Sequence, residues 1–224
     1  MNIRGKIMGL GALALTACTN FYAPEHFLVH PTIHLIFWGN WDASAQANKL
    51  QAEIDGGMLD RLAEYGNTGA TLSDQLYQPA SIPMGTAPGT YVEDATIDAT
   101  LESYFRTDAV PPPGKEDFYV VFLPPGTDTV NMIEHGGDAY PIGALHDGTY
   151  YTYAVILNVD TDVALSHELY EAITDPYGTG WHAGPNGAEA ADMCEPPISA
   201  TYTLDTFGGV QVAQVWSPSQ GKCL

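Results

Sequence analysis

A histidine and two glutamates lie within about one helical turn in the segment SHELYEAITDP, residues 166–176. His167 and Glu171 are four residues apart, so on a helix their side chains point the same way. Imidazole nitrogen and carboxylate oxygen are both ordinary zinc ligands. Glu168 follows His167 directly. In helices of the His-Glu-x-x-His type, the glutamate at that position holds the attacking water and takes its proton. The spacing predicts a site for metal-assisted hydrolysis in which Glu171 replaces the second histidine.

A catalytic zinc site needs a third protein ligand and an open position. The segment GTGWHAGPNGAEAADMCEPP, residues 178–197, offers candidates shortly after the helix. We favour Glu189 or Asp192, because a disulfide at the nearby Cys194 would stiffen that segment. His182 and the upstream His146, in GALHDG, remain alternatives.

The expected ligands also affect which metal would bind. One histidine and two carboxylates together cancel the double charge of the ion, so bound water would be acidified less than in a site with two histidines. An oxygen-rich set also weakens the preference for zinc, and manganese, iron or calcium become credible. Zinc is therefore the first expectation and another divalent cation the alternative. The competing interpretation is that the segment is only an acidic, solvated helix.

The first residues predict export. MNIRGKIMGLGALALTAC opens with Arg4 and Lys6 and then runs apolar, which is typical of a secretory signal and too short for a membrane span. The ending Leu-Thr-Ala-Cys resembles a bacterial lipobox, in which Cys18 becomes the lipidated first residue. We expect a signal peptide over residues 1–17, an anchor or linker over 18–31 and one domain over 32–224. An ordinary signal peptide with a chance cysteine is the alternative.

The net charge of the chain limits which partners it can bind. The chain after residue 18 keeps five basic residues against 27 acidic ones, a net charge of −22. Such a surface repels nucleic acid and anionic lipid, so we expect no nucleic-acid partner and membrane contact only through the lipid anchor.

The two remaining cysteines, Cys194 and Cys223, predict one disulfide in an exported domain; two free thiols are the alternative.

The apolar patterns predict a single α+β or α/β domain with a mixed sheet, a helix that carries the candidate metal site and an irregular, disulfide-tied C-terminal part. Strands are expected at residues 31–41, 118–123, 150–157 and 208–217. Helices are expected at residues 42–65, 94–105 and 160–174. A break at Gly56-Gly57 would interrupt the first helix. The order of the strands does not follow from the patterns.

These motifs, taken in order, resemble the exordium-like family, also called phosphate-induced protein 1, whose members occur in plant cell walls and in bacteria. The resemblance rests on IHLIFWGNW, FYVVFLPPGT, GALHDGTYYTYAVI, SHELYEAITDP, Trp181, GAEAADMCE and the terminal VQVAQVWS with its closing cysteine. It spans roughly residues 32–223 and implies that His167, Glu168, Glu171, Glu189 and Asp192 form one matched set. It also implies the disulfide. The family implies no secure enzymatic activity.

Two functions are consistent with these features. The first is an exported, lipid-anchored, zincin-like peptidase, with Glu168 as the general base and a peptide or a cell-envelope polymer as substrate. The second is a non-catalytic cell-envelope or cell-wall binding protein, whose metal site is structural or absent. For either, we expect the lipid anchor to hold the protein at the cell envelope, at the outer membrane if the source is Gram-negative.

Overall fold

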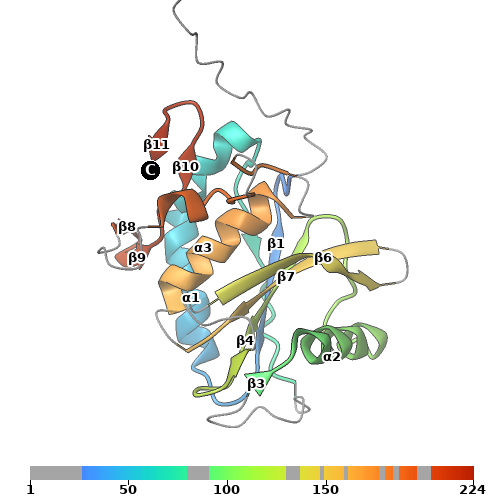
Figure 1. Ribbon diagram of the computed structural model, residues 1–224. Coiled ribbons are helices and arrows are strands. Elements are labelled where there is room, and N and C mark those ends of the chain that lie inside the picture. Colours follow the sequence, from blue (N-terminus) through green and yellow to red (C-terminus); the bar gives the residue numbers. More distant parts are fainter. Residues whose placement is uncertain are drawn as a thin grey trace, which may run out of the picture.

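A five-stranded mixed sheet forms the centre of the molecule (Figure 1). The computed structural model describes residues 27–79, 91–129, 137–146, 149–158, 161–176, 180–183, 187–195 and 203–224. The predicted leader and Cys18 lie outside these residues. Along the sheet the strands are β2 (Thr71–Leu72), β1 (Thr32–Phe37), β4 (Asp117–Phe122), β7 (Thr149–Ile156) and β6 (Gly137–His146). The first four run parallel, and β6 runs antiparallel to β7. The predicted mixed α+β architecture is therefore confirmed.

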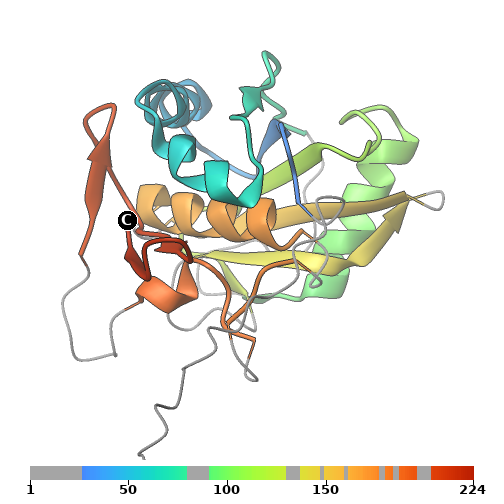
Figure 2. The same cartoon turned by 90° about the horizontal axis from the view of Figure 1, so that it is seen from above.

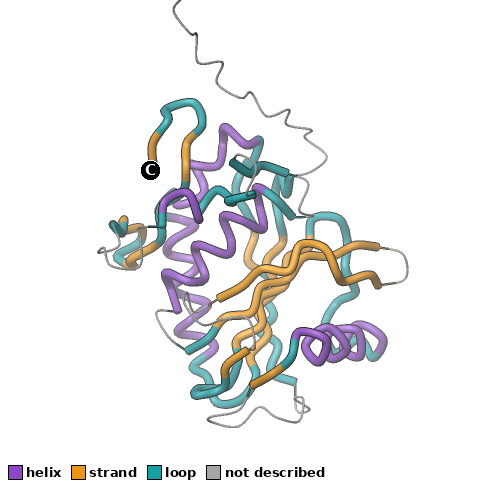
Figure 3. The backbone as a smooth tube through the Cα atoms, in the orientation of Figure 1, coloured by secondary structure: helices purple, strands orange, loops and turns teal. Residues whose placement is uncertain are grey.

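Side chains of the central strands alternate between two cores, one on each face of the sheet. On one face Ile33, Leu35 and Phe37 of β1 pack with the helices α1 (Ala43–Asp55) and α3 (Thr161–Thr174). On the other face Ile36 and Trp38 pack with α2 (Asp94–Arg106). Figure 3 shows α2 set apart from the other long helices. Strands buried on both faces explain the continuous apolar runs in the sequence.

The predicted helix over residues 42–65 is divided in two. The α-helix α1 ends at Asp55, and a separate 3₁₀ segment, η2 (Met58–Tyr65), follows. Gly57 has a φ of +87°, which side chains with a Cβ rarely adopt, so the Gly56-Gly57 pair allows the chain to turn here. The break expected from these glycines is present.

Helix α3 is enclosed on all sides. Every residue from Ala164 to Thr174 is buried. The helix contacts β6 and β7 on one side, and η2 and the short strand β9 (Val210–Val212) on the other. Figure 2 shows it lying between these layers. This enclosure excludes the interpretation of the segment as a solvated surface helix, because His167, Glu168 and Glu171 are 3 to 7% exposed.

The C-terminal part is irregular and is tied by a disulfide between Cys194 and Cys223, as predicted. The single strand expected over residues 208–217 is wrong. The chain instead forms a hairpin of β8 (Asp205–Phe207) with β9, and a second one of β10 (Trp216–Ser217) with β11 (Lys222–Cys223). A turn at Gly208, with a φ of +57°, separates β8 from β9. Two further two-residue strands, β3 (Tyr91–Val92) and β5 (Asp128–Thr129), pair in parallel.

Strand β6 is the longest of the strands that the apolar patterns missed. Its sequence, GDAYPIGALH, contains two glycines and a proline, which are weak strand formers. It lies at the edge of the sheet and pairs with β7 through a register irregularity between Tyr140 and Ala144. Proline and glycine are tolerated at such edges and bulges.

Among the described residues, no helix is both long and apolar enough to span a membrane.

Candidate metal centre

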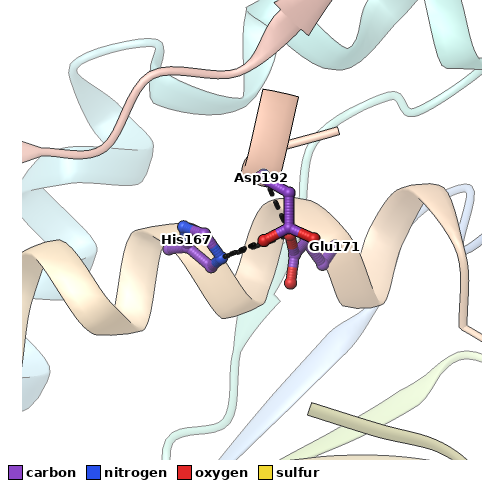
Figure 4. Close-up of side chains that lie close together, drawn as sticks. All are labelled: His167, Glu171 and Asp192. Atoms are coloured by element: carbon purple, nitrogen blue, oxygen red, sulfur yellow. Dashed lines mark hydrogen bonds and ion pairs between the residues drawn. The ribbon is translucent and has the colours of Figure 1, made fainter. Parts of the chain in front are cut away.

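Side chains from two separate elements converge beside α3 (Figure 4). Nε2 of His167 lies 3.2 Å from Oε1 of Glu171, one turn further along the helix. Oδ1 of Asp192, from the short 3₁₀ helix η3 (Asp192–Cys194), lies 3.6 Å from the same nitrogen. One ligand atom from each of these three residues lies within 4.8 Å of the other two. We call this set the triad.

The spacing of the triad fits a bound ion. Two ligand atoms that are each about 2.1 Å from a tetrahedral zinc lie about 3.4 Å from each other. The two distances from His167, 3.2 and 3.6 Å, fall on either side of that value. The donors are one imidazole and two carboxylates, and the charges of the two carboxylates would together cancel the double positive charge of an ion. Both the geometry and the chemistry of the triad therefore suit a divalent cation.

A hydrogen bond from the main chain sets the third member in place. The backbone N–H of Asp192 donates to Oε1 of Glu171 over 3.2 Å. The backbone N–H of Glu189 donates to Oδ2 of Asp192 over 3.3 Å, which orients that carboxylate. The segment is held further by the backbone N–H of Trp216, which donates to the backbone carbonyl of Ala190 over 2.8 Å. The loop is thus attached to both α3 and β10.

The imidazole of His167 is surrounded by negative charge. Burial by itself would lower the pKa of His167, but the charge of Glu171, hydrogen bonds with Asp192 and Glu171 and the charge of Glu168 raise it well above its usual value. A fourth carboxylate lies at the opposite ring nitrogen, where Oε1 of Glu195 is 3.6 Å from Nδ1. A cation is therefore stabilised at this position, either as a proton on His167 or as a metal ion.

Glu189 lies beside the triad and outside it. Burial, followed by the charges of Glu171, Asp175 and Asp192, raises the pKa of Glu189 well above its usual value. These carboxylates crowd one region, and their mutual repulsion is what a bound cation would relieve. Of the two acids that the sequence offered as a third ligand, Asp192 is the one that the structure places within the triad.

Glu168, the predicted general base, is 3% exposed on the same helix. Its charge contributes to the raised pKa of His167, which places the carboxylate in the electrostatic environment of the imidazole. Glu168 is therefore buried within electrostatic reach of the candidate ligand His167.

The other predicted candidates lie elsewhere. Nδ1 of His146 is 3.1 Å from Oε2 of Glu102 on α2, and its ring packs against Phe105. That places His146 against α2, which covers the face of the sheet opposite α3, so the structure does not bring it to the triad. Nδ1 of His182 lies 3.8 Å from Oδ2 of Asp175, just beyond the end of α3. It borders the acidic region without joining the triad.

Two residues near the site were missed in the sequence interpretation. Glu195 directly follows Cys194 in the segment that carries the candidate ligands. That position next to a predicted disulfide could have indicated that Glu195 lies near the site. Asp175 stands in the Thr-Asp-Pro sequence that ends α3. It is 4% exposed, and its Oδ1 accepts a hydrogen bond from the N–H of Gly180. It thus ties Gly180 back to the end of α3.

The centre opens to solvent on one side. The side chains of His167 and Glu171 are 8% and 7% exposed, whereas that of Asp192 is 43% exposed. A structural zinc site is closed by four protein ligands, and a catalytic one keeps a position for water or substrate. An accessible third ligand is consistent with the second kind of site.

Comparison with known proteins finds no matching family model and no matching curated protein. Among solved structures, metalloproteinase-II from Bacteroides fragilis is similar at a TM-score of 0.40 and 16% sequence identity. The superposed region covers 64% of this chain and 42% of that one. A likeness this loose identifies no shared fold or activity, so any function of the centre rests on its own geometry.

Proposed function

We propose that the protein is a metal-dependent hydrolase of the cell envelope that cleaves peptide bonds. The observation that carries this proposal is the triad of His167, Glu171 and Asp192, whose ligand atoms are spaced as they would be around one ion. Zinc is the first choice of metal, because imidazole and carboxylate are among its usual ligands. The resemblance of the motif order to the exordium-like family supports these three residues, within a matched set that also holds Glu168 and Glu189.

Each residue has a role that follows from its position. His167, Glu171 and Asp192 would hold the ion, and Glu168 would take the proton from the attacking water. When bound, a divalent ion supplies a Lewis acid that polarises a substrate carbonyl and acidifies water. The buried carboxylates of Glu168 and Glu171 are already desolvated, so no hydration shell has to be removed from them when substrate enters.

Metal content is the direct test. The purified protein is treated with a chelator, reloaded with zinc and dialysed, and bound metal is measured by mass spectrometry. We expect one zinc per chain, absent from His167→Ala, and retained in His146→Ala as the matched control, a buried histidine across the sheet. Circular dichroism checks that both variants stay folded. A folded wild-type protein that retains no divalent metal overturns the proposal.

Activity separates a catalytic centre from a structural one. Zinc-loaded protein is incubated with a fluorogenic peptide library and with denatured casein. Glu168→Gln should keep its metal and lose cleavage, because the amide cannot accept the proton of the attacking water. If chelation unfolds the domain and no peptide is cleaved, the site is structural, and the protein is a non-catalytic envelope protein.

Export and lipid anchoring belong to the same proposal. The basic and apolar leader and Cys18 support it, and the high acidity of the remaining chain suits an exported protein. Metabolic labelling with a fatty-acid analogue should mark the wild-type protein and leave Cys18→Ala unlabelled. An unlabelled wild-type protein found in the soluble fraction would contradict the anchor while leaving the metal centre untouched.

A further inference from the structure

We propose that Glu195 is a positioning residue that fixes the imidazole of His167 for metal binding. This inference rests on the proposed metal centre and assigns a role to a carboxylate that the triad does not include. Glu195 would hold the proton of His167 on Nδ1, so that the lone pair of Nε2 faces the two acidic ligands and the ion.

The contacts of the ring support this assignment. Nε2 faces Glu171 and Asp192 at 3.2 and 3.6 Å, and Nδ1 faces Oε1 of Glu195 at 3.6 Å. An ionised carboxylate only accepts hydrogen bonds, and a neutral imidazole carries its proton on one of its two nitrogens. When an ion takes the lone pair of Nε2, the proton must lie on Nδ1, and the charge of Glu195, 3.6 Å away, favours that tautomer electrostatically.

Glu195 is placed to orient His167 and not to bind the same ion. The two ring nitrogens point away from each other, so a carboxylate at Nδ1 lies on the far side of the ring from a metal at Nε2. The side chain of Glu195 is 17% exposed and that of His167 is 8% exposed. Both side chains are largely buried, so the charge of Glu195 is screened less than it would be in bulk water.

The chain holds Glu195 and the ligand Asp192 on one small rigid unit. The backbone N–H of Glu195 donates to the carbonyl of Asp192 over 3.0 Å and closes the 3₁₀ turn. Between them, Cys194 is bonded to Cys223, which fixes the turn to the C-terminal hairpin. The same unit thus carries one ligand and the acid that orients another, and the disulfide ties both to the C-terminal hairpin.

The test measures metal affinity in three variants of the full protein. Zinc dissociation constants are obtained by competition with a chromophoric chelator at one fixed pH. We expect Glu195→Ala to weaken zinc binding by about 10- to 100-fold, the usual effect of losing such a partner. Glu195→Gln keeps an accepting oxygen and should recover part of the loss. Glu102→Gln is the matched control, because that glutamate pairs with the buried His146 across the sheet; it should bind like wild type.

A spectroscopic measurement separates positioning from general structural damage. Nitrogen-15 histidine spectra of the zinc-loaded protein should show Nδ1–H and metal-bound Nε2 at His167, with the Nδ1–H resonance displaced in Glu195→Ala. The visible spectrum of the cobalt-loaded protein should keep its coordination number in that variant. Unchanged zinc affinity in Glu195→Ala, or a cobalt spectrum showing that a ligand has been lost, overturns the positioning role. If wild type binds no metal, the proposed centre itself fails.

Discussion

The backbone N–H of Asp192 donates a hydrogen bond to Oε1 of Glu171, 3.2 Å away, and so joins η3 to the buried helix α3. The same oxygen lies 3.2 Å from Nε2 of His167. One carboxylate oxygen therefore holds both the histidine and the loop in place before any ion is bound. A site that is assembled in this way loses less conformational entropy when it takes up metal.

This arrangement predicts that the two downstream acids are not equivalent. Asp192→Asn removes a charged ligand and should weaken zinc binding by at least about tenfold, the scale of losing a partner of the metal. Glu189→Gln keeps the triad and replaces an acid whose raised pKa already favours its neutral form, so it should change affinity much less. Competition with a chromophoric chelator measures both. Equal losses in the two variants would mean that Glu189 is also a ligand.

The sequence alone could predict His167 and Glu171, because the helical period fixes which residues share a face. It could not choose between Glu189 and Asp192, because that choice depends on a turn whose geometry is set by contacts with α3 and β10. Nor could it predict the burial of α3, which follows from how η2 and β9 cover the helix. The order of the strands was equally out of reach, since parallel pairing joins segments that are distant in sequence.

The wrong prediction of a single strand over residues 208–217 has a local cause. The run over residues 208–217 is apolar enough for one strand, but Gly208 packs its backbone against α1. A Cβ added there would lie 2.2 Å from the carbonyl oxygen of Ala52. That close approach and the positive φ bend the chain into a hairpin. Spacing of apolar residues carries no signal for such a contact.

Removal of the disulfide tests its link to the metal centre. In the double variant Cys194→Ser/Cys223→Ser, the bond between two positions 29 residues apart in sequence is lost. This loss should lower the free energy of unfolding by roughly 3–4 kcal/mol. It should also weaken zinc binding, because Asp192 and Glu195 flank Cys194. Urea unfolding and zinc competition measure the two effects. Wild-type zinc affinity in a folded double variant would show that the triad segment is held without the disulfide.

The raised pKa of His167 predicts opposite pH responses with and without metal. In the metal-free protein, protonated His167 is stabilised by its carboxylates, so this contribution is full below the unfolded pKa of 6.5 and is lost as pH rises through the folded value. Metal must displace the same proton, so zinc should stabilise the protein more as pH rises. Thermal unfolding over this range, with and without zinc, measures both trends. Zinc stabilisation that is independent of pH would indicate that His167 is not a ligand.

Another buried carboxylate, that of Glu53, lies on α1 within reach of the charge of Asp162 in the first turn of α3. Glu53 is 0% exposed, and neither of its oxygens has a hydrogen-bond partner among the described residues. Burial, together with the charge of Asp162 and against the opposing charge of Lys49, raises the pKa of Glu53 from 4.5 to about 8. The folded protein therefore keeps a proton on Glu53 at neutral pH, whereas the unfolded chain releases it.

This difference makes stability depend on pH in a known direction. The contribution of neutral Glu53 is full below pH 4.5 and is lost as pH rises through about 8. Glu53→Gln cannot ionise, so it should flatten this part of the curve and be more stable, relative to wild type, at about pH 8 than at about pH 5. Urea unfolding at both pH values measures the difference. Asp55→Asn, on the exposed side of the same helix, is the matched control. A wild-type curve parallel to that of Glu53→Gln would mean that Glu53 ionises alike in both states.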